Sequence, residues 1–469
     1  MTTPLRNLSR RNALHAGLVG SIGIGLPNLI SSRKSSAAMA TDTPAGFGNA
    51  KRCIVIFNWG GMSQLESWDP KPDAPVQVRG TYKPIATPIP GTQIGEYMPK
   101  LARQTNRLAI VRSVRHRARD HRQALYWSLT GVPPVILDGA MVSNPVLATR
   151  EDKPMLGSMT AWARGVPTGL PPTVTIPYQV AERGIVAGQN AGFLGVQYDP
   201  LVVRPKSGKP FPGVSPISST PNLKLGASMN DGRVDKRRRL LQQFDSSFDA
   251  DRSSQPMSVY QHFQGLAADL LTSPKVRKAF ELEREPKVVR KSFGDHILGK
   301  SLLLARRLIE TDIPMVIVNS GAGDLNGGAG AIWDTHFFNF PQLKNFLMPP
   351  FDHAASALLD DLDVRGMLDD TLVVLMTEFG RGPVINKVAG RDHSPDCYSV
   401  AFAGGGIQGG QVHGRSDKFA LTVKENPCGP GDLHATIFHA MGIDHHATLR
   451  DTKGESIPLS DGRPLPLFG

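Results

Sequence analysis

Short, almost uninterrupted apolar runs are the feature of this sequence that most restricts its fold. They are rich in β-branched residues, are bounded by polar turns, and occur at 53–57, 108–111, 173–176, 315–318, 371–376 and 398–403. A strand with one solvated face alternates apolar and polar residues, whereas a strand covered on both faces is apolar throughout. These runs therefore predict strands of a sheet that is buried on both sides.

Helical patterns separate several of these runs, at residues 299–309, 340–364 and 432–441. Strands that alternate with helices form mainly parallel sheets, because each crossover helix packs back against one face. We therefore predict an α/β fold with a mainly parallel sheet sandwiched by helices. In such sheets ligands bind beyond the carboxyl ends of the strands, so the residues that follow each strand are the candidates for function.

One long segment differs from the rest of the chain. Residues 178–258 are rich in Pro, Gly, Ser and Asn and have weak periodicity. This pattern predicts a loop-rich insertion or cap over the sheet edge rather than a second core. With 40% hydrophobic and 20% charged residues the composition is that of a globular protein, and we expect a single domain over residues 41–469.

Residues 1–40 have the layout of a twin-arginine export signal. Arg10-Arg11 precede a mild apolar run over residues 13–30, and Ala38-Met39-Ala40 supplies the small residues that a signal peptidase recognises. Glycines and Pro27 make the run weaker than a membrane anchor. We expect a periplasmic or extracellular protein without a membrane span after cleavage. The alternative is a basic, disordered N-terminus.

The balance of charge bears on the partners of the protein. The formal charge is +12, and the leader holds five basic and no acidic residues, which leaves +7 for the rest of the chain. Only Lys236-Arg237-Arg238-Arg239 forms a basic run, and it has no interleaved aromatic residues. We therefore interpret it as a solvated helix face and expect no nucleic-acid partner. A basic surface still favours an anionic small-molecule or polymer substrate.

Residues that could bind an anion follow two of the predicted strands. Gly60-Gly61 comes after the first strand, and backbone amides in such a loop can cradle an anion. The segment His116–Arg122 leads into a predicted helix that ends near Gly131. A helix N-terminus that carries His and Arg favours anions through its dipole and free amides.

Residues that could bind a metal lie farther along the chain. Asp334 and His336 stand two apart in a loop, where they could share a metal or act as a helix cap and a surface residue. Glu378 directly follows the strand predicted at 371–376, and Asp392-His393 precede the one at 398–403. A carboxylate at the carboxyl end of a strand is well placed for a ligand or a metal.

These motifs resemble a family of exported bacterial proteins called domain of unknown function fifteen-hundred-and-one. The matching stretches are Gly60-Gly61, Trp68-Asp69-Pro70-Lys71-Pro72, Gly192-Phe193-Leu194-Gly195, Tyr198-Asp199-Pro200, Leu270-Leu271-Thr272-Ser273-Pro274, Trp333-Asp334-Thr335-His336, Thr377-Glu378-Phe379-Gly380-Arg381, Gly390-Arg391-Asp392-His393 and Gly404-Gly405-Gly406-Ile407. The family is similar in fold to alkaline phosphatases and sulfatases. The resemblance therefore implies an alkaline-phosphatase-like sheet.

The resemblance also implies that the catalytic positions of that superfamily are rewritten. Gly60 or Gly61 stands where the superfamily has a metal-binding Asp, and His121 stands at the nucleophile position, ten residues before a closing Thr-Gly. Glu378-Phe379-Gly380 replaces an Asp-His-Gly, and His393 matches the last His. The metal ligands that remain as candidates are Asp334, His336, Glu378, Asp392 and His393.

This set implies one divalent ion in place of two, and the mixed nitrogen and oxygen ligands favour zinc. His121 would be a further ligand, a general base or a nucleophile. His121 and Asp120 are the catalytic candidates, and Gly60, Gly61 and Arg122 are the anion-binding candidates. We expect an exported metal-dependent hydrolase-like protein for phosphate or sulfate esters. The alternative is a non-catalytic envelope or binding protein on the same fold.

Overall fold

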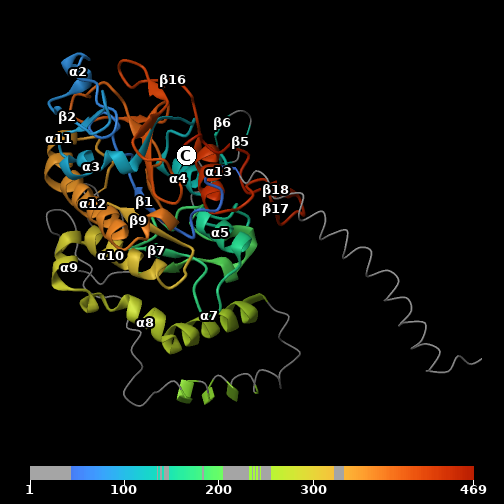
Figure 1. The fold of residues 1–469 in the computed structure, drawn as a ribbon. Helices are drawn as coiled ribbons and strands as arrows, with labels where there is room; N and C mark the ends of the chain where they lie inside the picture. Colours follow the sequence, from blue (N-terminus) through green and yellow to red (C-terminus); the bar gives the residue numbers. More distant parts are fainter. Residues whose placement is uncertain are drawn as a thin grey trace, which may run out of the picture. The chain divides into compact units, whose positions relative to one another are not determined.

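The computed structural model describes residues 44–134, 136–137, 140–141, 147–181, 184–203, 255–321 and 332–469, with isolated residues between 232 and 243 (Figure 1). The chain divides into two units, Met1–Ala45 and Gly46–Gly469. The predicted leader lies outside the described residues, as does most of the predicted insertion. The sheet, its helices and the candidate functional residues all belong to the second unit.

An eight-stranded sheet forms the centre of this unit. In spatial order its strands are β14 (Gln411–His413), β4 (Leu108–Val114), β13 (Tyr398–Ala403), β10 (Thr371–Met376), β1 (Arg52–Asn58), β9 (Met315–Ser320), β7 (Val174–Ile176) and β8 (Leu201–Val202). Only β13 runs antiparallel to its neighbours, β4 and β10, and the other pairs are parallel. The predicted mainly parallel sheet is confirmed, and each predicted strand overlaps one of these strands.

Helices cover both faces of the sheet. The helices are α2 (Val76–Arg79), α3 (Pro99–Arg103), α4 (His121–Thr130), α5 (Leu156–Arg164), α7 (Gln255–Thr272), α8 (Pro274–Phe280), α9 (Lys287–Phe293), α10 (Ile297–Ile309), α11 (Asn339–Gln342), α12 (Met348–Val364) and α13 (Pro430–Ala440). Of the described helices, none has the length and apolar character needed to cross a membrane.

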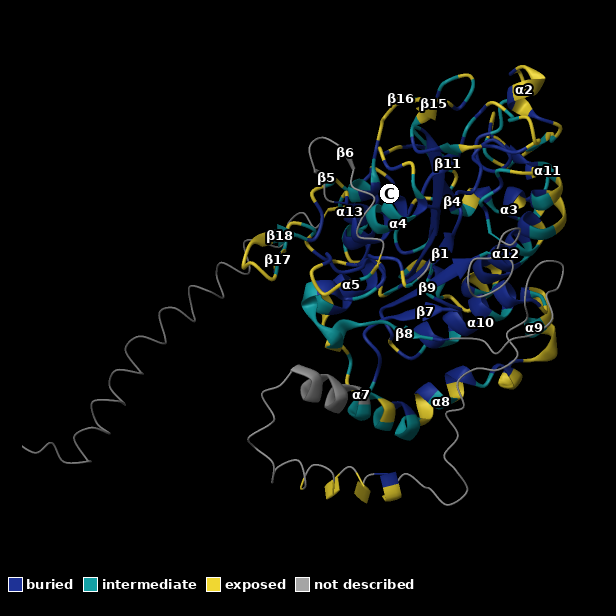
Figure 2. Cartoon of the chain, turned by 180° about the vertical axis from the view of Figure 1, so that it is seen from behind, coloured by how far each residue is buried: buried dark blue, intermediate teal, exposed yellow. Residues whose placement is uncertain are grey.

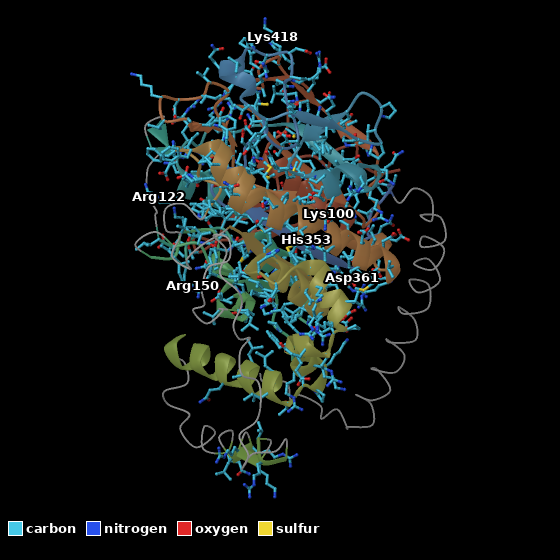
Figure 3. The ribbon with its side chains drawn as sticks, turned by 90° about the vertical axis from the view of Figure 1, so that its left-hand side faces the viewer. Lys100, Arg122, Arg150, His353, Asp361 and Lys418 are labelled. Atoms are coloured by element: carbon cyan, nitrogen blue, oxygen red, sulfur yellow. The ribbon has the colours of Figure 1, made fainter. Side chains whose placement is uncertain are left out.

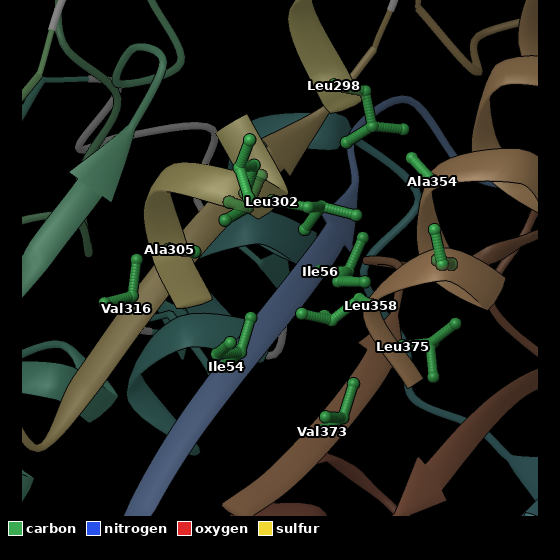
Figure 4. Packing of buried hydrophobic residues seen from close by; sticks show 14 of the residues in the cluster. Ile54, Ile56, Leu298, Leu302, Ala305, Val316, Ala354, Leu358, Val373 and Leu375 are labelled. Atoms are coloured by element: carbon green, nitrogen blue, oxygen red, sulfur yellow. The ribbon is translucent and has the colours of Figure 1, made fainter. Parts of the chain in front are cut away.

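The side chains of β1 show how the two cores arise. Successive residues of a strand point to opposite faces, so Ile54 and Ile56 face one side and Val55 faces the other. Ile54 and Ile56 pack with residues of α10 and α12 (Figure 4). Val55 packs in a second cluster with residues of α4, α5 and α13. Every residue of β1 after Arg52 is buried, and Figure 2 shows the same for the strands beside it.

Short elements fill the connections. They are β2 (Pro84–Ala86), β3 (Gln93–Gly95), β5 (Ile136–Leu137), β6 (Ala140–Met141), β11 (Gly380–Arg381), β12 (His393–Ser394), β15 (Arg415–Ser416), β16 (Val423–Glu425), β17 (Thr448–Arg450), β18 (Ser456–Pro458), the 3-10 turns η1 (Thr105–Arg107), η2 (Gly192–Leu194), η3 (Val196–Tyr198), η5 (Leu282–Arg284) and η7 (Leu368–Asp370), and the π-turn η6 (Leu343–Leu347). The pair formed by β11 and β12 bears most on function, because these two strands lie at the carboxyl edge of the sheet, next to the end of β10.

The antiparallel direction of β13 keeps a long segment at one edge of the sheet. β10 ends at the carboxyl edge, and β13 starts from that same edge because it runs the opposite way. Residues 377–397 therefore need no crossover. Glu378, Asp392 and His393 stay together at the edge where β1, β4 and β9 also end.

Candidate metal centre

Histidines and carboxylates from three connections meet at the carboxyl edge of the sheet. We call them the strand-end cluster, which consists of His121, Asp334, His336, Glu378, Arg381, Asp392 and His393. His121 follows β4, Asp334 and His336 follow β9, and the other four follow β10. All five residues that the sequence predicted as metal ligands thus lie together, and the catalytic candidate His121 lies beside them.

Three members converge on one point. A ring nitrogen of His121, a carboxylate oxygen of Asp334 and a ring nitrogen of His393 lie within 4.8 Å of one another. Asp334 is 3.2 Å from His121 Nε2 through Oδ2 and 3.4 Å from His393 Nε2 through Oδ1. Nε2 of His121 is buried, and within the described residues it has no partner with hydrogen-bond geometry. Such an atom is costly unless it has a ligand.

His336 extends this group toward solvent. Its Nε2 lies 2.8 Å from His393 Nε2 and 3.2 Å from Asp334 Oδ1. Its Nδ1 lies 3.0 Å from Oδ1 of the exposed Asp392. If Nδ1 donates its proton to Asp392, Nε2 presents a lone pair toward Asp334 and His393. The arrangement can therefore offer a further nitrogen to a cation.

Glu378 lies behind His121 rather than beside Asp334. Its side chain is 0% exposed, and Oε1 accepts the Gly60 N–H at 2.8 Å and lies 2.8 Å from His121 Nδ1. Oε2 accepts from the Thr377 hydroxyl at 3.2 Å. A carboxylate on one ring nitrogen fixes the tautomer and turns the other nitrogen outward. Glu378 thus has the geometry of a residue that orients His121.

His116, which the sequence placed only at the start of a segment that could bind an anion, is a positioning residue. Its Nδ1 accepts the Ala118 N–H at 3.1 Å, so Nε2 is the donor to the Glu378 carbonyl at 2.6 Å. Burial lowers the pKa of His116 to about 4, which keeps the ring neutral in this role. The ring therefore holds the backbone of Glu378 in place.

Arg381 is the second residue that sequence analysis left without a role. Its side chain is 0% exposed and contacts Asp334 Oδ1, and its Nε donates to the Gly61 carbonyl at 3.0 Å. Its Nη2 donates to the Gly60 carbonyl. The available signal was its place in the motif that begins at Thr377. Arg381 ties the loop after β1 to Asp334.

Gly60 and Gly61 allow close packing around the cluster. Both have positive φ, 110° and 81°. A Cβ on Gly60 would lie 2.4 Å from the backbone nitrogen of Asp334, and one on Gly61 would lie 2.7 Å from the Phe379 ring. The Gly60 amide, which the sequence assigned to an anion, is bonded to Glu378.

Asp120 and Arg122 lie at the start of α4 and outside the contacts of the cluster. The Asp120 carboxylate caps the helix by accepting the Arg122 N–H at 3.1 Å, and it also pairs with the Arg122 side chain at 2.9 Å. The cap explains why α4 begins at His121. In this position Asp120 fixes the backbone from which His121 projects.

The charges of the cluster do not balance. Three carboxylates, on Asp334, Glu378 and Asp392, face one permanent cation, Arg381. Burial alone would lower the pKa of His121, but the adjacent Asp334 and Glu378 raise it to about 9. Burial alone would raise the pKa of Asp334, but the two histidines and Arg381 lower it well below its usual range. The site therefore favours added positive charge.

Aromatic rings enclose the inner side of the cluster. The Phe379 ring lies 4.8 Å from the ring of His121 and 4.6 Å from that of His393, and the Trp59 ring lies 5.1 Å from His121. Apolar walls exclude water and strengthen electrostatic interactions. An open groove lined by Lys100, His353 and Asp361, among others, includes none of the cluster residues (Figure 3).

Comparisons with known proteins give a family and several similar folds. The family described as protein of unknown function (DUF1501) matches residues 50–466. No curated protein sequence matches the chain. A PsFucS1 sulfatase from Pseudoalteromonas sp. is similar at 13% identity and TM-score 0.36, over 88% of this chain and 70% of that one. The lipoteichoic acid synthase LtaP from Listeria monocytogenes is similar at 11% identity and TM-score 0.36, over 90% of this chain and 77% of that one. The phosphonate monoester hydrolase SpPMH from Silicibacter pomeroyi is similar at 12% identity and TM-score 0.32, over 89% of this chain and 76% of that one.

Proposed function

Because the chain belongs to the DUF1501 family and gathers histidines and carboxylates at one sheet edge, we propose that the strand-end cluster binds one divalent metal ion. The observation that carries the proposal is the convergence of His121, Asp334 and His393 within 4.8 Å. The excess of carboxylates over permanent cations supports it, since a divalent ion neutralises that excess.

The residues divide into ligands and residues that orient them. Nε2 of His121, a carboxylate oxygen of Asp334 and Nε2 of His393 would bind the ion, and His336 Nε2 is the candidate for a fourth position. Glu378 and Asp392 would act through His121 and His336, as carboxylates behind metal-bound histidines do. Mixed nitrogen and oxygen ligands suit zinc.

We propose that the protein is an exported, metal-dependent hydrolase-like protein that acts on phosphate or sulfate esters. A bound ion would polarise an ester oxygen or lower the pKa of a bound water. The two nitrogens of His121 face Glu378 and Asp334, which favours a ligand over a nucleophile. Arg117 is exposed on the segment that leads to His121, and its charge would attract an anionic ester.

The second candidate is a non-catalytic envelope or binding protein with the same metal site. The observation that favours it is the occupant of the nucleophile position. His121 stands there in place of Ser, Thr or Cys, and both of its ring nitrogens have partners at ion-pair distance. Such a protein would bind an anionic ligand at its metal ion and would not hydrolyse that ligand.

Metal analysis of the purified chain tests the proposal. After exhaustive dialysis without chelator we expect about one transition-metal ion per chain, as in other protein zinc sites. The variants His121→Ala and His393→Ala should lose the ion. His353→Ala is the matched control, because His353 is a partly buried histidine on α12 outside the cluster.

Two outcomes decide between the candidates. A wild-type chain that retains no ion, even after reconstitution with zinc, would contradict the metal site itself. A chain that retains zinc but hydrolyses neither aryl phosphates nor aryl sulfates would favour the binding protein over the hydrolase.

A further inference from the structure

Two exposed phenylalanines directly follow His336. Phe337 is 60% exposed and Phe338 is 62% exposed, and Val388 on the facing loop is 43% exposed. The centroid of the Phe337 ring lies 6.5 Å from that of the His336 ring. We call Phe337, Phe338 and Val388 the apolar rim. Exposed apolar residues grouped beside a polar site mark the place where a ligand or partner binds.

The apolar rim and the strand-end cluster share one rigid frame. Phe338 N–H donates to the Val388 carbonyl at 3.1 Å, and Asn339 N–H donates to the Ala389 carbonyl at 2.9 Å. The Asn386 side chain donates to the His336 carbonyl at 2.9 Å. The loops that carry the rim are thus the loops that carry His336, Asp392 and His393.

The backbone of Phe338 is strained. Its φ is 49° and its ψ is 43°, which is the left-handed region, and the facing Ala389 has a φ of 54°. A bulky residue is a true outlier there, whereas Gly or Asn fits well. An exposed ring also gains little from burial in the fold. Strain kept at an exposed side chain is typical of functional positions.

A segment with exposed arginines adjoins His393, and the side chain of one of them, Arg119, pairs with Asp396. The carbonyl of Arg119 accepts from His393 Nδ1 at 2.7 Å, so the exposed segment with Arg117 and Arg119 adjoins His393. His393 Nε2 in turn lies 2.8 Å from His336 Nε2, and His336 adjoins Phe337. A ligand at the cluster would therefore have the segment that carries Arg117 next to His393 and the ring of Phe337 next to His336.

We propose that the natural ligand of the strand-end cluster is an anionic ester whose next group is a ring, and that the flat face of this ring packs on Phe337 and Phe338. The proposal rests on the proposed function and adds the substrate class. Aromatic side chains contact flat ring faces through stacked or edge-to-face arrangements. An acyl chain would instead be served by an enclosed apolar channel, whereas this rim is open. Aryl and pyranose rings share the required shape.

Calorimetric titration of the zinc-loaded chain tests this inference. The probes are the ethyl, phenyl and glucosyl esters of phosphate and of sulfate. We expect at least one ring ester to bind roughly tenfold more tightly than the ethyl ester, the factor that a ring contact of this kind provides. The ring that binds more tightly identifies the aryl or the sugar source.

Variants of the rim sharpen the test. Phe337→Ala and Phe338→Ala should lose the preference for ring esters and leave the ethyl ester unchanged. Phe338→Tyr should keep the preference. Val364→Ala is the matched control, because Val364 is an exposed apolar residue at the end of α12. Phe338→Gly should lose the preference yet raise the melting temperature, because Gly relieves the left-handed strain.

The outcomes separate this inference from the function on which it rests. If ethyl and ring esters bind the wild type equally, the ring contact is wrong and the metal site is unaffected. If Phe338→Gly lowers the melting temperature, the ring serves the fold, which overturns the inference. If the zinc-loaded chain binds none of the esters, the proposed function is wrong and the inference falls with it.

Discussion

The strand-end cluster and a second buried ionic group on the helices differ in how they balance charge. The second group, which we call the helix network, joins Arg306, Arg307 and Arg365 to Glu285, Glu310 and Asp361. Arg306 is buried at its centre, 3.0 Å from Glu285, 3.1 Å from Glu310 and 2.9 Å from Asp361. Three permanent cations therefore match three carboxylates.

The comparison indicates what each group can do. The contacts of Arg306 through Nε and Nη2 are at ion-pair distance without hydrogen-bond geometry, so Coulomb attraction is their main contribution. The helix network is neutral and needs nothing from outside. The strand-end cluster sets three carboxylates against one arginine and supplies imidazole nitrogens in place of further cations. A neutral group can only stabilise the fold, whereas a group short of positive charge can also bind a cation.

The largest expected effect comes from opening the helix network. Arg306→Met would leave the buried Glu285 and the partly buried Asp361 without their central cation, and we expect the unfolding free energy to fall by about 3–5 kcal/mol. Urea denaturation measures this loss. Arg365→Met is the control, because Arg365 is more exposed and should cost less. If the Arg306→Met chain folded but no longer bound metal, the helix network would contribute to metal binding, and the distinction between the two groups would be wrong.

Zinc should stabilise the chain through the strand-end cluster alone. At a free zinc concentration a hundredfold above its Kd, the unfolding free energy should rise by about 2.7 kcal/mol. The increment should vanish in His393→Ala and persist in Arg306→Met. Thermal or urea unfolding with and without zinc measures it. An equal increment in His393→Ala would place zinc elsewhere on the chain.

Removing an orienting carboxylate should weaken the site without abolishing it. Asp392→Asn would leave His336 Nδ1 without its charged partner, and we expect zinc affinity to fall about tenfold. Competition with a chromophoric chelator measures the affinity. Asp396→Asn is the control, because Asp396 lies on the same loop and pairs with Arg119 instead. Unchanged affinity in Asp392→Asn would remove His336 from the set of ligands.

The smallest expected effect is a change with pH in the stability that the helix network contributes. Burial alone would raise the pKa of Glu285, but Arg306 and Arg307 lower it below its ordinary value of 4.5. A carboxyl with a lowered folded pKa contributes stability above the unfolded pKa and loses it as pH falls through the folded one. The stability gap between wild type and Glu285→Gln should therefore narrow below pH 4.5. A gap that widens on acidification would contradict the assigned ion pairs.

The sheet could be predicted from the sequence because burial on both faces leaves a local pattern in each strand. The direction of β13 could not be predicted, because an apolar run has the same pattern in a parallel and in an antiparallel strand. The helix expected at 340–364 is interrupted by the π-turn η6 at Leu343–Leu347 before α12 begins. Asp432, where the helical pattern at 432–441 begins, lies at the third position of α13, and its side chain accepts the Gly429 N–H at 2.8 Å.

The cluster was predictable as far as strand ends determine it. His121, Asp334 and His393 follow or precede strands that meet at one edge, so residue type and position sufficed. The place of Glu378 behind His121 depends on side-chain reach, and no spacing encodes that. The roles of Arg381 and His116 depend on contacts with carbonyl groups of Gly60, Gly61 and Glu378, to which sequence patterns are blind.

The contact between His121 and Glu378 joins residues that are 257 positions apart in the chain. No short peptide cut from this protein can contain both, whereas the ligands of a zinc finger lie close together in the sequence. The two come together only when β4 and β10 are both in the sheet on either side of β13. Tight metal binding would thus report on the assembly of the whole sheet, and it could serve as a probe of when folding is complete.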